Sequence, residues 1–509
     1  MRDLATMSFD LAIANSAKVK TFSSLTGEPL AELPQSTEDD VAEAYRRARR
    51  ARRAWGAVPV AKRAQILLRF HDLLLDRQDE IIDLIQVETG KSRWHAYQEV
   101  AGTTMNARYY GFRSRQLLKI RRRYGLLPWL THVMELRVPV GVVGVISPWN
   151  YPFELGLSDV LPALMAGNGV VHKPDNQGAL GVLWGHELLR EAGLPDGIYQ
   201  IVLGDGPTVG GAVVEGADHI CFTGSTKVGK LVAERASTRL IGCSLELGGK
   251  NPLLVLDDVD PATAASGAAR DCFTAAGQLC GSSERLYVHT RVYDRFMAEF
   301  VAQVRAMRVS TDLSYNADMG SVVSQRQFDT VRSHLDDAVA KGAEVVIGGR
   351  HRPDIGPFVL EPTVLSGVTE AMTCFAEETF GPVVSVYRCE SVDEAVRLAN
   401  ASSYGLNACV WGGDVRRAQQ IAARLHCGTV NVNEIFGVSY GSVDSPMGGM
   451  KNSGVGRRHG VEGLLRFTEA KTIATQRGMQ LEPPFNLGYD TLAKAYSTAL
   501  RIFKFCHRR

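Results

Sequence analysis

Hydrophobic positions follow two different spacings along the chain, and the change falls near residue 121. Before it, apolar side chains such as Phe70 and Leu74 recur at helical spacing and predict helices over 38–55 and 61–86. After it, short apolar runs bounded by Gly or Pro alternate with helical stretches, which predicts parallel α/β sheets covered on both faces. Two such series follow each other, so we expect two α/β lobes. The expected strands are 140–146, 169–173, 197–203 and 219–222, then 252–256, 284–288, 344–347, 383–388, 408–411 and 428–432, with a helix at 178–192.

Length and composition narrow the class of protein. A chain of 509 residues is too long for one hydrophobic core and fits two or three domains of roughly 100–200 residues each. A net charge of +2 gives no field that would mark nucleic acid as a partner. The nine cysteines form no C-x-x-C pair, so we expect neither a metal site nor a disulfide framework.

The N-terminal residues and the most apolar stretch bear on location. Residues 1–30 lack the basic-then-apolar order of a signal peptide, so we expect a cytoplasmic protein. The apolar stretch 138–171 is interrupted by several prolines and reads as buried strand, loop and helix rather than a membrane span.

Several segments resemble nucleotide-binding loops. Residues 221–230 place a glycine turn between an apolar strand and a helical stretch, where free N–H groups could hold a phosphate. The segment nearly matches a Walker A loop, but Leu231 stands where a hydroxyl would be needed, so we do not expect an ATPase. Gly204 and Gly206 resemble the start of a dinucleotide fingerprint that lacks its third glycine. Lys173 would lie at the carboxyl end of a sheet, where open α/β sheets bind ligands.

Asn150, Glu246 and Cys280 each lie in a loop that glycine or proline fixes beside an apolar strand. Rigid loops at strand ends commonly hold reactive groups. Each residue alone has an ordinary structural explanation, since a free cysteine is usually a small buried hydrophobe and a loop asparagine usually caps its own backbone. Only their combination points to catalysis.

In order, spacing and local sequence over nearly the whole chain, these segments resemble the aldehyde dehydrogenase superfamily. The resemblance implies an α/β fold with a Rossmann-like cofactor lobe, an α/β catalytic lobe and a small oligomerisation arm. The matching motifs are 148–152 (PWNYP), 222–225 (FTGS), 246–250 (ELGGK), the Cys280 loop, 377–382 (EETFGP) and 448–454 (GGMKNSG). The implied divisions are a cofactor-binding domain at 1–117 and 141–247, a catalytic domain at 248–450, the arm at 118–140 and 451–480, and a C-terminal tail at 481–509.

The resemblance also implies catalytic roles. Cys280 would attack the aldehyde carbon as a thiolate and give a thiohemiacetal. The side-chain amide of Asn150 and the backbone N–H of Cys280 would stabilise the oxyanion. Hydride transfer to NAD(P) would leave a thioester on Cys280, and Glu246 would activate the water that releases the carboxylic acid.

A nicotinamide cofactor site follows from the same resemblance. NAD-preferring relatives usually carry an acidic residue three positions after the lysine, where this chain has Asn176. A 2′-phosphate would meet no like charge there and could pair with Lys173, so we predict NADP as the preferred cofactor and NAD as a weaker one. The alternative is that Asp175 faces the ribose and repels the phosphate. The implied cofactor-binding residues are Trp149, Asn150, Lys173, Pro174, Asp175, Asn176, Gly224, Ser225, Leu247, Glu378 and Phe380.

Within the superfamily the chain is most similar to the actinobacterial type of succinate-semialdehyde dehydrogenase, in residues 147–150, 173–175 and 446–460. We therefore predict oxidation of succinate semialdehyde to succinate. Many such enzymes place arginines for the substrate carboxylate at the positions of Ser158 and Thr274. Their absence leaves a general dehydrogenase for uncharged aldehydes as the alternative.

Other functions and partners are less consistent with these residues. Glu246 argues against an acyl-CoA-forming relative, which would dispense with a hydrolytic base, and Cys280 with Glu246 argues against a non-catalytic binding protein. The resemblance implies a homodimer or homotetramer with an intersubunit arm at 118–140 and 460–476. The basic, amphipathic tail 489–509 is expected to pack on a neighbouring subunit or to fray rather than to lie on an anionic membrane.

Overall fold

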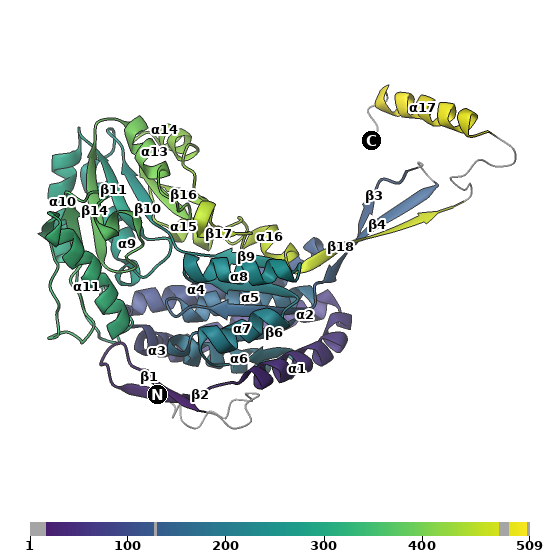
Figure 1. Cartoon of the computed structure of the whole chain (residues 1–509), viewed down its shortest axis with the longest axis horizontal. Helices are drawn as coiled ribbons and strands as arrows, with labels where there is room; N and C mark the ends of the chain where they lie inside the picture. The colour runs from purple at the N-terminus through teal and green to yellow at the C-terminus, as the bar shows by residue number, and fades with distance from the viewer. Residues whose placement is uncertain (1–16, 127–129, 478–487, 506–509) are drawn as a thin grey trace.

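The computed structural model describes residues 17–126, 130–477 and 488–505 of the chain. Figure 1 shows two α/β bodies beside each other and a narrow β arm that extends away from one of them. The first body is built around a six-stranded sheet and the second around a seven-stranded sheet. The two predicted α/β lobes are therefore confirmed.

The six-stranded sheet runs in the order β17-β9-β8-β5-β6-β7. Neighbouring strands from β9 to β7 are parallel, whereas β17 is antiparallel to β9. Every residue of β6 and β8 is buried, as a parallel sheet covered by helices requires. The strands are β5 (Val142–Ser147), β6 (Gly169–Pro174), β7 (Tyr199–Ile201), β8 (His219–Thr223), β9 (Gly242–Glu246) and β17 (Gly454–Val455).

Helices α1 to α8 pack around this sheet (Figure 1). Helix α1 begins with a capping box, in which Thr37 and Asp40 each accept the other's backbone N–H. The single helix expected over 61–86 is wrong, because the backbone leaves the helical conformation at Arg77 (φ −117°, ψ 21°) and separates α2 from α3. The helices are α1 (Glu38–Ala57), α2 (Val60–Asp76), α3 (Gln78–Thr89), α4 (Arg93–Leu117), α5 (Pro152–Ala166), α6 (Ala179–Glu191), α7 (Gly211–Gly216) and α8 (Thr226–Thr238).

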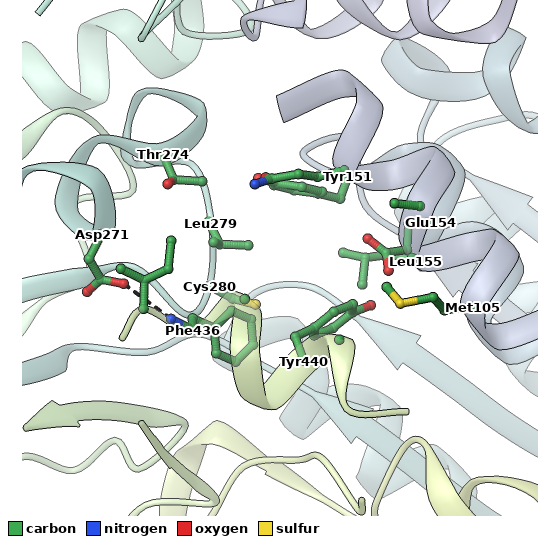
Figure 2. Close-up of a pocket in the computed structure, with 16 residues that line it drawn as sticks. Met105, Tyr151, Glu154, Leu155, Asp271, Thr274, Leu279, Cys280, Phe436 and Tyr440 are labelled. Carbon is green, nitrogen blue, oxygen red and sulfur yellow. Dashed lines mark hydrogen bonds between the residues drawn. The ribbon is translucent and has the colours of Figure 1, made fainter. Parts of the chain in front are cut away.

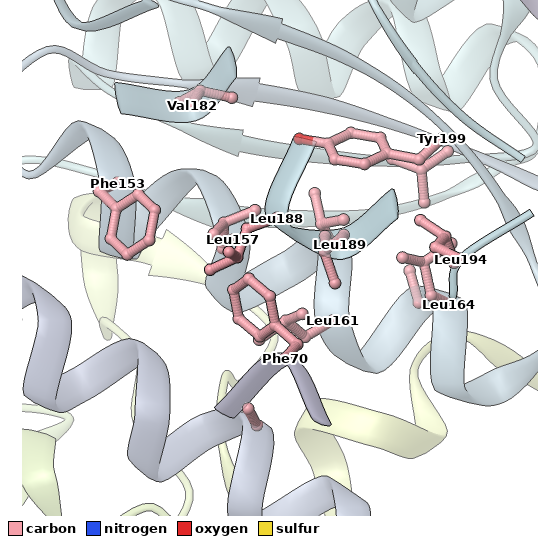
Figure 3. Packing of buried hydrophobic residues seen from close by; sticks show 14 of the residues in the cluster. Phe70, Phe153, Leu157, Leu161, Leu164, Val182, Leu188, Leu189, Leu194 and Tyr199 are labelled. Carbon is pink, nitrogen blue, oxygen red and sulfur yellow. The ribbon is translucent and has the colours of Figure 1, made fainter. Parts of the chain in front are cut away.

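Helix α5 is held in the core of the first body. Its Leu157, Leu161 and Leu164 lie at helical spacing and are fully buried. Figure 3 shows them close to Phe70 of α2 and Leu189 of α6. The start of α5, two residues after Asn150, is therefore fixed by packing.

The seven-stranded sheet runs in the order β12-β13-β14-β11-β10-β15-β16. Its neighbouring strands are parallel except for β12 with β13. Strand β13, like β9 of the first sheet, was not predicted from the hydrophobic pattern. The strands are β10 (Asn251–Val255), β11 (Ser283–His289), β12 (Glu344–Ile347), β13 (Thr363–Ser366), β14 (Val383–Cys389), β15 (Asn407–Trp411) and β16 (Thr429–Val432). The helices are α9 (Pro261–Phe273), α10 (Tyr293–Ala306), α11 (Gln325–Ala340), α12 (Thr373–Ala376), α13 (Val392–Asn400), α14 (Val415–Ala422) and α15 (Gly437–Gly441).

The arm is a three-stranded antiparallel sheet. Strand β4 (Thr131–Pro139) pairs along its length with β18 (Thr468–Gln476), and β3 (Arg121–Arg123) adds to the other edge. Not all of 451–480 lies in this arm, because β17 joins the six-stranded sheet and α16 (Gly460–Leu465) packs on α5.

The described chain begins with a β-hairpin and ends with a helix. A hairpin of β1 (Lys18–Phe22) and β2 (Pro29–Pro34) precedes α1. Helix α17 (Tyr489–Phe505) forms in the expected tail and has no buried residue, while 506–509 of that tail, 478–487 and 1–16 lie outside the described residues. No helix within the described ranges has the length and hydropathy needed to cross a membrane.

Candidate active site

The loop before Cys280 has an unusual backbone. Residues 275–277 follow α9 with φ values of 49°, 55° and 70°, so the chain turns through three left-handed residues in succession. Such conformations persist only where surrounding contacts enforce them. Here the N–H of Ala275 donates to the Nδ1 of His95 at 3.2 Å. Further along, the Nδ2 of Asn251 donates to the carbonyl oxygens of Cys280 (2.7 Å) and Ser282 (2.8 Å). The turn thus presents Cys280 in a fixed position.

The Cys280 thiol is half-buried and free. Burial raises its pKa to about 12, and the carboxylates of Glu378 and Glu246 act in the same direction. The sulfur is therefore protonated at neutral pH and needs a base to accept its proton.

Asn150 lies between β5 and α5, and its side chain is directed at the cysteine loop. Its Nδ2 donates to the carbonyl oxygen of Gln278 at 3.0 Å, two residues before Cys280. Its own carbonyl oxygen accepts from the Nζ of Lys91 at 2.7 Å. One N–H of the Asn150 amide remains for another acceptor.

A buried ion pair that the sequence did not reveal supports this segment. The Nζ of Lys91 lies 2.5 Å from an Oε1 of Glu99, and both side chains are almost fully buried. The other oxygen of Glu99 accepts from the backbone N–H groups of Phe153 (2.9 Å) and Glu154 (3.1 Å), at the start of α5. Lys91 also lies 3.6 Å from the ring centre of Tyr151. The pair therefore joins α4 to the loop that carries Asn150.

Glu246 is the last residue of β9 and is 5% exposed. Burial raises the pKa of its carboxyl to about 7, whereas Arg458 acts in the opposite direction. Arg458 is itself committed to a buried ion pair with Asp159 at 2.8 Å. The Oε2 of Glu246 has no hydrogen-bond partner among the described residues. Glu246 thus has the properties of a general base near neutral pH.

The expected adenosine site lies at the end of β6. The Nζ of Lys173 donates only to the carbonyl oxygen of Pro174 (3.2 Å) in the described part of the chain. Asp175 accepts from the backbone N–H of Gln177 at 2.9 Å and so caps the following turn. Asn176 donates to Gln35 at 3.0 Å, and its Oδ1 is unpartnered within the described ranges. Both Lys173 and Asn176 retain capacity to bind a ligand.

The expected pyrophosphate site is the start of α8. Gly224 directly precedes Ser225, whose side chain caps the helix by accepting from the N–H of Val228. Leu247 packs on this helix so closely that a Cβ at Gly229 would lie 2.3 Å from its side chain. The helix start is thereby fixed, and its free N–H groups suit an anion.

Trp149 and Phe380 bring the two bodies together. Their rings meet edge to face with centres 5.5 Å apart. Phe380 has a positive φ of 53°, and the Glu284 carboxylate holds its N–H at 3.0 Å. Glu378, two residues earlier, accepts from the N–H of Gly249 at 2.8 Å.

A cavity opens beside Cys280 (Figure 2). Its walls come from α4 and α5 of the first body and from 271–280 and 435–441 of the second. Thr274 lines it, whereas Ser158 is buried within α5 and donates to the carbonyl oxygen of Leu155 at 3.4 Å. The polar lining residues are Gln98, Tyr151, Glu154, Asp271, Thr274 and Tyr440.

Comparison with known protein families shows the family of this chain. The family described as "Aldehyde dehydrogenase family" matches residues 12–473. The chain belongs to the aldehyde dehydrogenase family. The predicted family, fold class and enzyme class are thereby confirmed.

Two similar relatives of this aldehyde dehydrogenase are mycobacterial. It is 50% identical to "Putative succinate-semialdehyde dehydrogenase [NADP(+)]" from Mycolicibacterium smegmatis, over 94% of this chain and 92% of the relative. It is 49% identical to a protein of the same name, numbered 2, from Mycobacterium tuberculosis, over 95% and 94%. Among solved structures, betaine aldehyde dehydrogenase from Staphylococcus aureus in complex with NAD+ is 30% identical with a TM-score of 0.88, covering 95% of this chain and 98% of that one.

Proposed function

We propose that this aldehyde dehydrogenase oxidises its substrate to a carboxylic acid through a covalent adduct on Cys280, with NADP as the preferred cofactor. One observation carries the proposal: Cys280 lines a cavity, the Asn150 amide donates to a carbonyl oxygen of the same loop, and the Glu246 carboxyl, with a pKa of about 7, acts electrostatically on the Cys280 thiol. These are the nucleophile, the oxyanion donor and the base that the reaction needs.

Adduct formation begins with the thiol proton. Ionised Glu246 accepts this proton, and the sulfur of Cys280 then forms a bond to the aldehyde carbon. The carbonyl electron pair moves to oxygen, which becomes an oxyanion. The second N–H of the Asn150 amide and the backbone N–H of Cys280 donate to this oxyanion, and loss of one such donor typically costs about 10²–10³-fold in rate.

The residues of the proposed cofactor site fit a nicotinamide dinucleotide. Lys173 and Asn176 hold unused hydrogen-bonding capacity, and the start of α8 offers free N–H groups for the pyrophosphate. Glu378 and the Trp149–Phe380 pair would hold the nicotinamide ribose and ring where the two bodies meet. When bound, the nicotinamide supplies the hydride acceptor of the reaction.

NADP is favoured over NAD by the charges at the end of β6. Asn176 is neutral, so it does not repel a 2′-phosphate. A carboxylate oxygen of Asp175 accepts the backbone N–H of Gln177 in the turn that Asp175 caps. The carboxylate is therefore directed toward the backbone rather than toward a ribose. Lys173 is the cation that would pair with the phosphate.

Hydrolysis of the thioester completes the reaction. After Glu246 has released the thiol proton to solvent, it removes a proton from water, and the resulting hydroxide adds to the thioester carbon. The bond to the Cys280 sulfur then breaks, and the sulfur takes its proton back from Glu246. A base with a pKa near 7 suits this step because it is largely ionised at pH 8 yet can still give up a proton. The presence of such a base favours acid rather than acyl-CoA as the product.

The relatives' names make succinate semialdehyde the first substrate to assay, in agreement with the sequence prediction. The direct test is NADPH formation by the full chain over a panel of aldehydes, beside Cys280→Ala. We expect turnover by the unaltered enzyme and none by the variant, with NADP binding retained in both. Equal turnover by Cys280→Ala would overturn the proposal.

A further inference from the structure

The lining of the cavity beside Cys280 lacks the positive charge that would bind an anionic substrate. Among the described residues that line it, none is Lys, Arg or His. Two lining residues, Glu154 and Asp271, are acidic instead. Burial raises the pKa of Asp271 to about 6, so this side chain is mostly ionised at the pH where Glu246 is active. A carboxylate that entered would find a negative charge and no counter-ion.

The buried cations behind the cavity wall already have partners. Lys91 is bound to Glu99 and does not itself line the cavity, although it contacts the ring of Tyr151, which does. Arg458 is bound to Asp159. If Lys91 turned toward a substrate, it would leave Glu99 buried without its cation, which is strongly unfavourable. If Arg458 turned, it would break its hydrogen bonds to Asp159 and Thr223, although Arg466 would still pair with Asp159.

A second hollow adjoins the first and shares Gln98, Thr274, Ile435 and Gly437 with it. Its cation is Arg270, whose side chain is half exposed and forms an ion pair with Glu434 at 3.4 Å. Solvent therefore screens Arg270, and Glu434 already pairs with it, outside the lining of the cavity beside Cys280.

Besides the neutral polar groups named above, the remaining surface of the cavity is apolar. Met105, Leu155, Leu279 and Phe436 surround the space near Cys280 (Figure 2). Burying an alkyl or aromatic chain against them is favourable, whereas a buried carboxylate would exchange its hydration for neutral donors such as the Tyr151 and Tyr440 hydroxyls, with no cation in the lining.

We propose that this cavity selects uncharged aldehydes with an apolar chain and disfavours those that carry a carboxylate, succinate semialdehyde included. The inference rests on the proposed function, because it concerns the substrate of the same Cys280 site. It identifies the charge of the lining, rather than the length of the substrate, as the feature that determines specificity.

A matched pair of substrates tests the inference with the full chain. Succinic semialdehyde and its methyl ester, methyl 4-oxobutanoate, share the reacting end and the chain, and differ in the charge. We expect kcat/KM for NADPH formation to be at least tenfold higher with the ester. A smaller difference, or a preference for the acid, would overturn the inference and leave the proposed function intact. No turnover of either, with NADP binding retained, would overturn the proposed function itself and the inference with it.

Substitution of Thr274 tests whether the charge of the cavity lining determines the substrate preference, because it can add a positive charge there. Thr274→Arg places a cation in the lining, and Thr274→Gln adds a polar chain without charge. We expect Thr274→Arg to shift the ratio of kcat/KM values at least tenfold toward succinic semialdehyde, and Thr274→Gln to keep the ratio of the unaltered enzyme. If Thr274→Arg still oxidises the ester but leaves the ratio unchanged, the missing charge does not exclude the anion and the inference fails.

Discussion

The rate at which the acyl-enzyme is hydrolysed should depend on pH through the ionisation of Glu246. Burial raises the pKa of this carboxyl to about 7. Only the ionised form can take a proton from water, so hydrolysis should slow as the pH falls through this value. The ionised fraction drops from about nine-tenths at pH 8 to about one-tenth at pH 6, which predicts a roughly tenfold fall in rate.

An activated ester isolates this step from hydride transfer. p-Nitrophenyl acetate can acylate Cys280 without any cofactor, and a burst of nitrophenol followed by a slower phase would report acylation and hydrolysis separately. Detection at the isosbestic wavelength removes the effect of nitrophenol ionisation. We expect the slower phase to follow a single ionisation near pH 7.

Glu246→Gln keeps the shape of the side chain and removes the base. Hydrolysis should fall by on the order of 10²–10⁴-fold and lose its dependence on pH. Glu234→Gln, at an exposed carboxylate on α8, is the matched control and should behave as the unaltered enzyme. Hydrolysis at an undiminished rate in Glu246→Gln, or the same pH profile in that variant, would refute the assignment of the base.

Three further predictions follow from the site. Asn150→Ala should lower kcat by about 10²–10³-fold in steady-state assays, because it removes one oxyanion donor. Lys91→Met leaves Glu99 buried without its cation and should cost ~3–5 kcal/mol, seen as a lower melting temperature that Glu99→Gln partly restores. Asn176→Glu places a carboxylate at the proposed 2′-phosphate site and should shift the ratio of kcat/KM values at least about tenfold from NADP toward NAD, whereas Asn176→Gln should not.

The fold could be predicted where the hydrophobic pattern is long and regular. The buried run of β6 and the capped start of α1 at Glu38 lie where the sequence indicated. The break at Arg77 was missed because neither glycine nor proline marks it. Its side chain instead forms ion pairs with Glu80 and Glu191, and Glu191 lies far along the chain. Strand β13 has only four residues, too few to show a period.

The candidate site also contains residues that the sequence indicated and residues that it did not. Cys280, Asn150 and Glu246 could be singled out because glycine and proline fix their loops beside apolar strands. The Lys91–Glu99 pair could not, because a buried ion pair leaves no periodic signal and its contacts with the start of α5 arise only on folding. The charge of the cavity lining was equally hidden, since Glu154 and Asp271 come from different bodies.

For Ser158 and Thr274, the position in the structure decides whether the residue can affect the substrate. Both stand where the sequence comparison expected arginine, yet only Thr274 lines the cavity. Ser158 is buried inside α5, where its hydroxyl meets a carbonyl of the same helix. Only the structure shows which of the two positions can influence the substrate.

The central claim is that Cys280 carries the acyl group. Mass spectrometry of the unaltered enzyme, quenched in acid during the burst of its reaction with p-nitrophenyl acetate and then digested, tests it directly. The account predicts an acetyl group on the peptide that contains Cys280, in near-stoichiometric amount, and none on that peptide in Cys280→Ala. An acetyl group found mainly on another cysteine, or no stable acyl-enzyme at all, would contradict it.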